Sequence, residues 1–318
     1  MPLFDTDADD LADLAQRAAD ADPGVRRVAM LALAEMPEAE AADLLIQGLA
    51  DPMPEVRAAA AQALEGHPGN TVAAALIAAL DDPDPRVRDA AAAVFVERHE
   101  VGAAPLLIAR ASHGSAFART AALRGLRELA VPDATGVALS SLNDPHPVVR
   151  REAVAVLGWL RAEVAQPALA LAAADPEPDV RRAAMAALVF TRPGAPAVAA
   201  LISGLRDGAW QVREEAAATL GRNRLPEAEA ALIRAMDDAI WQVRLKAAAA
   251  LGRLGAHAAV PALAEALGSE VSNLRKEAAA ALGEIGDAAA LPALRVAATD
   301  EDTEVRKVAL WAIGRCGR

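Results

Sequence analysis

The stretch DAIWQVRLKAAAALG at residues 238–252 contains the pattern that decides the fold, a Val-Arg pair followed by an alanine-rich run. With Val243 as position zero, small or apolar residues stand at offsets +4, +5, +8 and +11, namely Ala247, Ala248, Leu251 and Leu254. These offsets share one face of a helix with 3.6 residues per turn. The stretch therefore predicts an amphipathic helix whose apolar stripe is built mostly from alanine.

The pattern recurs ten times with a spacing of 31 residues, apart from one gap of 32. The residues at position zero are Val25, Val56, Val87, Ala118, Val149, Val180, Val212, Val243, Leu274 and Val305, and arginine follows each of them. We number the repeats one to ten in this order. A fixed period of this length is typical of stacked repeats.

Each repeat holds a second apolar segment upstream, such as AADLLIQGLA at 41–50 and VPALAEAL at 260–267. Acidic residues at −3 and prolines at −2 are typical helix starts, and glycines at +12 (Gly255, Gly286, Gly317) are typical helix ends. We therefore predict two helices of roughly 10–13 residues per repeat. Neither helix can bury its apolar stripe alone, so neighbouring repeats must stack.

The motif D-P-x-x-x-V-R-x-x-A-A-x-A-L-G, nearly intact at 300–314 and 238–252, resembles the short HEAT-like repeat of the phycobilisome-lyase (PBS lyase) group. The resemblance covers essentially the whole chain. It implies an all-α, right-handed α-solenoid of about ten 31-residue helix pairs, forming a single domain over residues 1–318. The second helices are expected to start near residues 23, 54, 85, 116, 147, 178, 210, 241, 272 and 303.

Two irregularities interrupt the pattern. Repeat four, SHGSAFARTAALRGL, lacks the Asp-Pro turn and the valine, so the stacking is expected to bend or loosen there. The extra residue before Val212 falls near RPGAP at 192–196, where we expect a longer turn.

The charge of the chain is −12 and is unevenly distributed. Residues 1–100 hold 20 Asp and Glu against 7 Arg, whereas residues 101–318 hold 24 acidic and 25 basic residues. Nucleic-acid binding needs clustered Lys and Arg, so this balance argues against it. The single cysteine, the acidic start and the lack of a long apolar run predict a cytoplasmic protein without a membrane span.

Asp at −5 and Arg at +1 recur in most repeats and are expected to form a ladder of ion pairs between neighbouring repeats. A residue that recurs in every repeat is expected to stabilise the stacking of the repeats, so these acid–base pairs do not indicate catalysis.

Function is expected where the copies differ. On the second helix, offsets −1, +2, +3, +6 and +10 project away from the core stripe, and the family resemblance implies that this face is concave. From repeat five onward, aromatic and basic residues gather there, and tryptophan replaces proline at −2 in repeats seven and eight. The predicted binding residues are Arg151, Trp159, Arg182, Phe190, Trp210, Arg222, Trp241, Lys246, Arg253, Lys276, Lys307, Trp311 and Arg315.

A packing interpretation stands beside this prediction. The tryptophans at −2 can fill the space of the prolines, and Trp159 and Phe190 can fill gaps left by alanines. The basic side chains at +2 and +3 can pair with acidic residues on the same face (Glu152, Glu214, Glu215 and Glu277).

Catalytic or metal-binding constellations are not evident. The five histidines (His67, His99, His113, His146 and His257) occupy non-equivalent offsets, whereas a metal needs ligands that converge. Deoxyhypusine hydroxylases resemble this fold but need several His-Glu pairs, and only His99-Glu100 occurs here. Cys316 has no evident base and is expected at a fraying end. We predict no catalytic residue, no metal and no cofactor.

These observations predict a non-catalytic scaffold whose groove, mainly in repeats five to ten, binds an acidic or amphipathic segment of another protein. The alternative is a cofactor-handling lyase or maturation factor resembling the bilin lyases, with a small anionic tetrapyrrole on the same aromatic and basic surface. A third hypothesis, nucleic-acid binding as in HEAT-type alkylpurine glycosylases, is disfavoured by the net charge.

Overall fold

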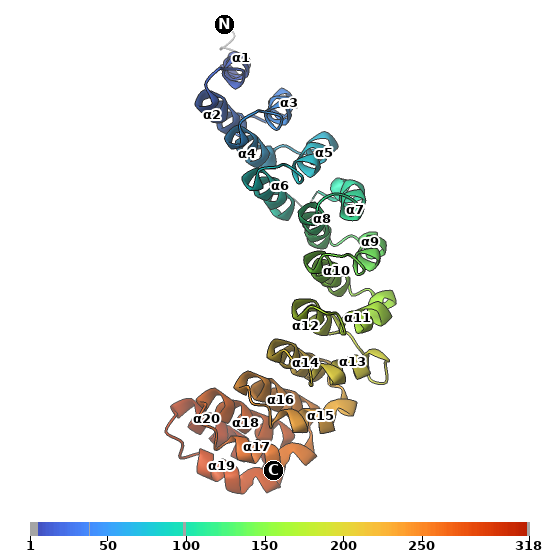
Figure 1. The fold of residues 1–318 in the computed structure, drawn as a ribbon. Coiled ribbons are helices and arrows are strands. Elements are labelled where there is room, and N and C mark those ends of the chain that lie inside the picture. The colour runs from blue at the N-terminus through green and yellow to red at the C-terminus, as the bar shows by residue number, and fades with distance from the viewer. Residues whose placement is uncertain (1–5, 38, 98–99, 317–318) are drawn as a thin grey trace. The chain divides into compact units, whose positions relative to one another are not determined.

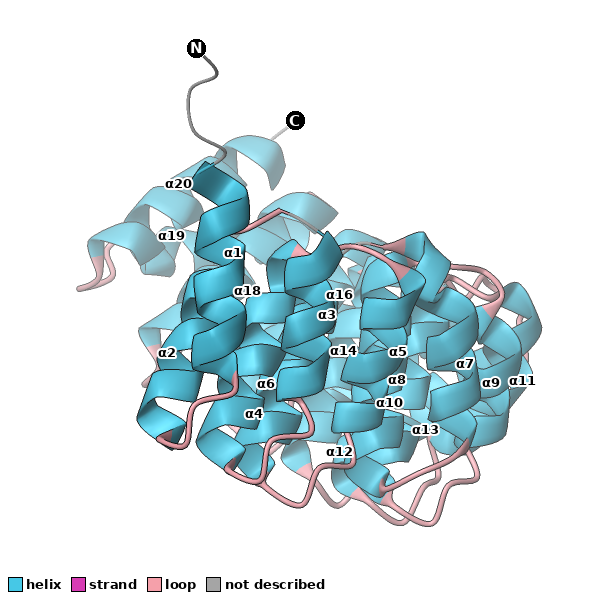
Figure 2. Ribbon diagram, turned by 90° about the horizontal axis from the view of Figure 1, so that it is seen from above, coloured by secondary structure: helices cyan, strands magenta, loops and turns pink. Residues whose placement is uncertain are grey.

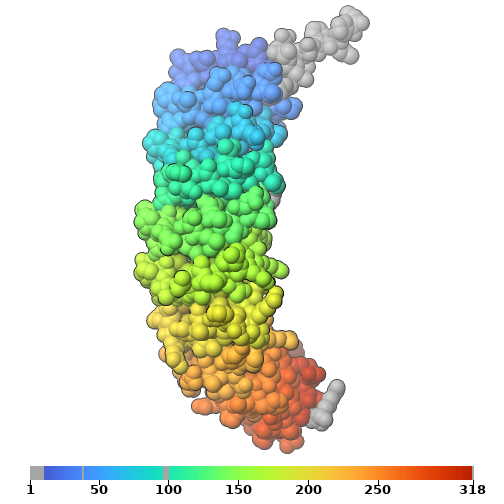
Figure 3. All heavy atoms as spheres, turned by 90° about the vertical axis from the view of Figure 1, so that its right-hand side faces the viewer, coloured from blue at the N-terminus to red at the C-terminus, as the bar shows by residue number. Residues whose placement is uncertain are grey.

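Helices make up all the regular structure in the residues that the computed structural model describes, 6–37, 39–97 and 100–316 (Figure 2). The predicted all-α solenoid is confirmed. The chain divides into two compact units, residues 1–160 and 161–318. Within each unit the repeats follow one another in sequence order (Figure 3).

The second helix of each repeat begins two residues before position zero. These helices are α2 (Pro23–Leu33), α4 (Pro54–Ala63), α6 (Pro85–Glu97), α8 (Ala116–Leu129), α10 (Pro147–Trp159), α12 (Pro178–Ala187), α14 (Trp210–Asn223), α16 (Trp241–Leu254), α18 (Ser272–Ile285) and α20 (Thr303–Cys316). Proline fits this first position because the N–H that it lacks would have no partner within the helix.

The first helices lie beside the second helices in each unit (Figure 1). They are α1 (Thr6–Ala18), α3 (Ala39–Gly48), α5 (Asn70–Ala79), α7 (Ala104–Ser112), α9 (Ala134–Ser141), α11 (Gln166–Ala172), α13 (Ala197–Gly204), α15 (Glu229–Ala235), α17 (Val260–Ala266) and α19 (Leu291–Ala297). Short 3₁₀ helices lie at Leu64–Gly66, Val101–Ala103, Glu163–Ala165, Pro226–Ala228, His257–Ala259 and Ala288–Ala290.

Most first helices are shorter than predicted, and α11, α15, α17 and α19 have only seven residues. The second residue of α11, α17 and α19 is Pro167, Pro261 and Pro292, respectively. Since proline has no N–H to donate, the α-helical hydrogen bonds begin there. The three residues before each of these helices form a 3₁₀ helix instead.

The alanine stripe of the second helices forms the core. Val243, Ala247, Ala248 and Leu251 of α16 are completely buried. A Cβ atom built on Gly252 would lie 2.8 Å from the Cα of Ala281 in α18, so the glycine allows the two helix backbones to come close. Small residues thus let successive second helices pack as thin layers.

In three repeats offset +3 is buried, which differs from the prediction for this offset. Ala59, Ala121 and Glu152 stand at this offset and are 4–6% exposed. Glu152 in α10 bonds Arg127 of α8 at 2.6 Å, so its side chain reaches the preceding repeat. Since successive second helices pack directly on one another, the preceding helix covers offset +3 in these repeats.

The predicted ladder is confirmed within each unit. Arg213 donates from Nε and Nη2 to the two carboxylate oxygens of Asp238 in the next repeat, at 2.6 and 2.9 Å. Equivalent bidentate pairs join Arg26 to Asp51, Arg57 to Asp82, Arg119 to Asp144, Arg181 to Asp207 and Arg275 to Asp300.

Each ladder residue also bonds its own turn. Arg213 Nη1 donates to the carbonyl oxygen of Asp207 at 2.8 Å, and Asp238 accepts from the Ile240 N–H at 2.9 Å. The Arg213 guanidinium lowers the pKa of Asp238, against the opposing effect of burial. The ladder therefore fixes the turn before each second helix as well as the distance between repeats.

Repeat four has no Asp at the ladder position, where His113 stands instead. The Arg88 guanidinium lies over the Phe117 ring, with 5.5 Å from Cζ to the ring centroid, and this contact occupies the position of an ion pair. Further along, the turn between α12 and α13 contains Gly194, whose N–H donates to Glu227 at 2.6 Å. This turn contains the RPGAP segment.

Among the described residues, no helix is both long and apolar enough to cross a membrane.

Replacing Asp238 by Asn should lower the free energy of unfolding by about 2–3 kcal/mol, because the largely buried Arg213 guanidinium loses its counter-charge. Urea unfolding followed by circular dichroism measures the effect. The matched control is Asp237→Asn, because Asp237 is exposed and should change stability by no more than about 0.5 kcal/mol. Equal losses in the two variants would contradict the structural role of the ladder.

Candidate functional site

The predicted binding residues fall into both units. Arg151 and Trp159 lie on α10 in residues 1–160, and the other predicted residues belong to residues 161–318. None is fully buried, and Trp159 and Trp311 are 63% and 49% exposed. Solvent can therefore reach all of these side chains, and each unit is described separately below.

Three predicted basic residues surround one carboxylate in the second unit. Lys246 and Arg253 of α16 and Lys276 of α18 all interact electrostatically with Glu277. Burial is the main cause that raises the pKa of Glu277, and the nearby Glu284 raises it further, while the three cations lower it. The net effect is a raised pKa, so this carboxylate is held in a partly desolvated position between α16 and α18.

The close packing of α16 on α18 brings these charges together. A Cβ atom on Gly252 would lie 2.7 Å from Glu284 Oε2, so the glycine leaves room for this carboxylate beside α16. No ion pair of Lys246, Arg253 or Lys276 is found within the described ranges. We call Lys246, Arg253 and Lys276 the cationic cluster.

Trp311 lies on α20, the second helix of the repeat that follows the cationic cluster. A Cβ atom on Gly283 of α18 would overlap the Trp311 ring, so the glycine makes room for the indole. The indole thus packs on α18 but stays half exposed. An aromatic surface fixed in this way offers a binding partner a contact that costs little side-chain entropy.

Two predicted basic residues are engaged by carboxylates. Arg222 Nη2 contacts Glu215 Oε1 at 2.7 Å and Thr219 Oγ1 at 2.7 Å, all on α14. Lys307 Nζ contacts Glu304 Oε1 at 2.8 Å on α20. These two basic side chains are therefore paired with acidic residues of their own helices. Arg182 and Arg315 are exposed and form no ion pair within the described part of the chain.

The aromatic residues have different roles. The Arg161 guanidinium lies over the Phe190 ring, 4.3 Å from its centroid, so part of Phe190 is covered. Trp210 and Trp241 are the first residues of α14 and α16, the position that proline occupies in other repeats, and both are partly exposed. They therefore stand at the helix start, where other repeats have proline, and remain accessible to solvent.

In the first unit, Arg151 is partly exposed and Trp159 is the last residue of α10. The neighbouring Glu152 belongs to the packing between repeats, where it bonds Arg127 at 2.6 Å and lies 3.9 Å from Arg124. Glu152 therefore does not neutralise the predicted surface but joins α8 to α10.

Sequence reasoning missed Arg161 and Glu284. Arg161 stands at +12, the helix-end offset, and adopts a left-handed φ of 51°, and its side chain lies over Phe190 of the next repeat. Glu284 stands at +10 of repeat nine, one of the offsets predicted to project from the core, but it was not among the predicted binding residues. Comparing offset +12 of one repeat with +10 of the next would have found the Arg161–Phe190 contact.

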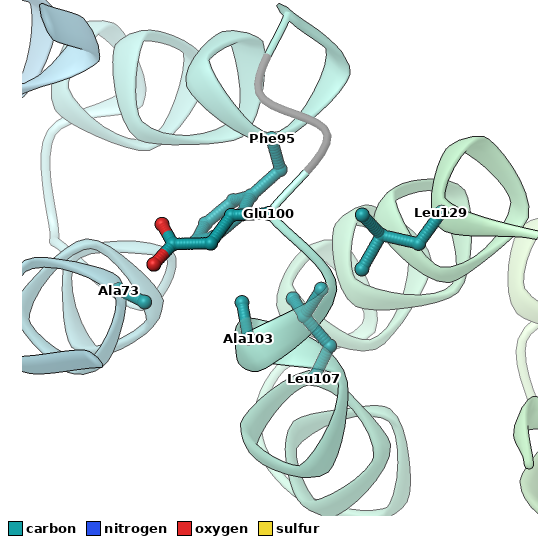
Figure 4. A pocket seen from close by; sticks show the side chains of 6 residues that line it. All are labelled: Ala73, Phe95, Glu100, Ala103, Leu107 and Leu129. Carbon is teal, nitrogen blue, oxygen red and sulfur yellow. The ribbon is translucent and has the colours of Figure 1, made fainter. Parts of the chain in front are cut away.

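A small cavity in the first unit is too small for a ligand. Ala73, Phe95, Glu100, Ala103, Leu107 and Leu129 line it (Figure 4). Its volume is about 10 Å³, which is close to the space that one water molecule needs.

In the described part of the chain, no group of three or more His, Cys, Asp or Glu could hold a metal ion. His67 is buried with Nε2 3.3 Å from the Leu33 carbonyl oxygen, and His99 lies outside the described residues. Cys316 is buried rather than frayed, and its Sγ donates to the Leu282 carbonyl oxygen at 3.5 Å. Burial raises the pKa of its thiol, which reduces its reactivity at neutral pH.

Solved structures with the same fold include helical proteins of quite different origin. An engineered protein aligns with a TM-score of 0.59 at 20% identity, over 97% of this chain and 99% of that chain. The Escherichia coli protein YibA aligns with a TM-score of 0.62 at 22% identity, over 76% of this chain and 91% of its own. At these identities the likeness shows the fold alone.

Nuclear transport receptors are also similar in fold. Kap95p, solved with RanGDP, aligns with a TM-score of 0.64 at 16% identity over 96% of this chain. Kap121p, solved with the extreme C-terminus of the protein phosphatase Cdc14p, aligns with a TM-score of 0.62 at 17% identity over 99% of this chain. The present chain spans 50% of the first and 42% of the second.

The chain matches none of the curated proteins with which it was compared. The family described as HEAT repeats matches residues 11–96, 103–189, 198–281 and 267–318. Together with the stacked helix pairs and the Arg–Asp ladder, this match identifies the chain as a member of the HEAT repeat family.

Proposed function

We propose that this chain is a non-catalytic interaction scaffold, and that the second-helix face of residues 161–318 binds an acidic or amphipathic segment of a partner protein. The observation that carries the proposal is the cationic cluster around Glu277, with Trp311 exposed on the adjacent helix. Cations that form no direct ion pair, together with an anchored aromatic residue, are common energetic centres of protein interfaces.

The local charge favours an acidic partner. Residues 161–318 hold 19 Lys and Arg and 20 Asp and Glu, so the unit as a whole is almost neutral. Three of its arginines, Arg181, Arg213 and Arg275, are paired in the ladder, whereas the cationic cluster forms no ion pair in the described part of the chain. An acidic segment therefore meets a local excess of positive charge without the strong field that general nucleic-acid binding requires.

Structurally similar proteins support this kind of activity. Kap121p was solved with the extreme C-terminus of Cdc14p, and Kap95p with RanGDP, so solenoids of this fold accommodate protein partners. A binding role for Arg151 and Trp159 remains a prediction. The similarity to phycobilisome-lyase repeats and a cytoplasmic location are likewise predictions.

Replacing Lys246, Arg253 and Lys276 together by Glu should weaken binding of an acidic amphipathic peptide at least about tenfold, because attraction becomes repulsion. The probe is a fluorescein-labelled helical peptide of 15 residues with Glu on one face and Leu on the other, followed by fluorescence anisotropy. Circular dichroism checks that the variant keeps its helical structure.

The matched control reverses three exposed arginines outside the second helices, Arg206, Arg234 and Arg295, and should bind the peptide as the unmodified chain does. If both triple variants bound the peptide equally weakly, the change in net charge would explain the effect, and the assigned surface would be contradicted. Adding biliverdin or haem tests the lyase-like alternative, because a saturable absorbance shift lost in the first variant would favour a tetrapyrrole ligand.

Glu277→Gln should stabilise the chain more at pH 7 than at pH 4. Folding raises the pKa of Glu277, which means that the folded state disfavours the ionised carboxylate. The chain therefore loses stability as the pH rises through the raised pKa of Glu277. Removing the ionisable group removes this loss, whereas at pH 4 both chains carry little charge at this position.

Urea unfolding at both pH values measures the difference. Glu214→Gln, on the partly exposed +2 position of α14, makes the same chemical change and serves as the control. A stabilisation by Glu277→Gln that does not depend on pH would show that Glu277 is not held in the described environment.

A further inference from the structure

One ladder arginine lacks the partner that its equivalents have. Arg244 stands at +1 of repeat eight, but Ser269 occupies the place of the aspartate in repeat nine. Arg244 Nη1 still donates to the Asp238 carbonyl oxygen at 2.6 Å, as in the other repeats. The guanidinium is therefore held in the ladder position, while Nε and Nη2 bond no carboxylate in the described ranges.

Ser269 performs only half of the aspartate's role. Its Oγ accepts from the Val271 N–H at 3.2 Å, just as Asp238 accepts from Ile240. A hydroxyl group cannot supply the pair of anionic oxygens that the guanidinium binds elsewhere. The turn before α18 is thus capped, but the ion pair to the preceding repeat is missing.

The other ladder position without Asp is compensated differently. There Arg88 lies over the Phe117 ring, which covers the guanidinium. No ring contact of this kind is found for Arg244 among the described residues. Arg244 therefore differs from Arg88 as well as from the paired arginines.

Arg244 lines an open pocket of about 460 Å³. Its walls come from the turn after α15, from α16, α17 and α18, and from the turn before α18, and they include Ser269 and Leu274. The volume lies within the range of small-molecule and peptide side-chain sites. The pocket thus gives access to a guanidinium that is fixed in place before any ligand arrives.

The acidic residues of the pocket restrict the ligand. Asp238 is already paired with Arg213 at 2.6 Å, whereas Asp237 and Glu265 are exposed and have no ion pair in the described part of the chain. They would repel a multiply charged anion and attract a cation. A ligand that fits both sides carries a carboxylate for Arg244 and a nearby positive group for Asp237 or Glu265.

We propose that this pocket binds a carboxylate with a neighbouring cationic group, and that the carboxylate takes the place of the missing ladder aspartate on Arg244. The ligand is either a free amino acid or a protein segment in which Asp or Glu stands next to Lys or Arg. This site is separate from the cationic cluster and does not depend on the function proposed for it.

Titration of the full chain with acetyl-Asp-Lys-amide and, separately, with free L-arginine tests the site. Isothermal calorimetry and the NMR signal of the Arg244 Nε–H group report binding. Saturable binding of the dipeptide alone indicates a protein segment, and binding of the amino acid alone indicates a small ligand. Binding of neither probe would overturn the proposal.

Ser269→Asp is the decisive variant, because the new carboxylate should pair with Arg244 and compete with the ligand. It should weaken binding at least tenfold without lowering the urea midpoint. Arg244→Gln should also lose binding. Unchanged affinity in Ser269→Asp, with the NMR signal showing Arg244 paired, would contradict the proposed position of the carboxylate.

Asp237→Asn combined with Glu265→Gln tests the charge preference. The double variant should lose the preference for acetyl-Asp-Lys-amide over acetyl-Asp-Ala-amide. Retention of that preference would show that these two carboxylates do not select the cationic group.

Discussion

No repeat of this chain can bury its apolar stripe by itself, so each layer depends on the contacts that join it to the next. Two contacts recur: alanine and glycine let second helices approach closely, and the Arg–Asp pairs fix the turn between the layers. Alanine favours the helix but buries little area per residue, so a single repeat cannot offset its conformational entropy. Stability therefore accumulates from neighbour to neighbour.

This constraint separates structural from functional positions. Offsets +1, +4, +5, +8 and −5 are occupied in nearly every repeat by residues that stack or pair. Offsets +2, +6 and +10 are free to vary, and in the second unit they carry Lys276, Trp311 and Arg253. Departures from the ladder also indicate function, because an arginine that is held in the ladder position without an aspartate partner can bind a carboxylate of a ligand. Both proposals arise from departures from the repeat.

The period of 31 residues and the helix-start signals were enough to predict the all-α solenoid and the ladder, because these features depend on contacts that are the same in each repeat. The lengths of the first helices were predicted less well, since Pro167, Pro261 and Pro292 set where α-helical bonding begins. The burial of Glu152 and the Arg161–Phe190 contact depend on the particular side chains of two adjacent repeats. A helical wheel for one repeat does not include the neighbour that covers it.

The central functional claim is that partner segments contact α16 and α18 through their second-helix face. Photo-crosslinking locates such a contact directly, with the acidic amphipathic peptide carrying a central benzoylphenylalanine and the products mapped by mass spectrometry. We expect crosslinks within residues 241–254 and 272–285. Crosslinks confined to the first helices α15, α17 and α19 would contradict the account.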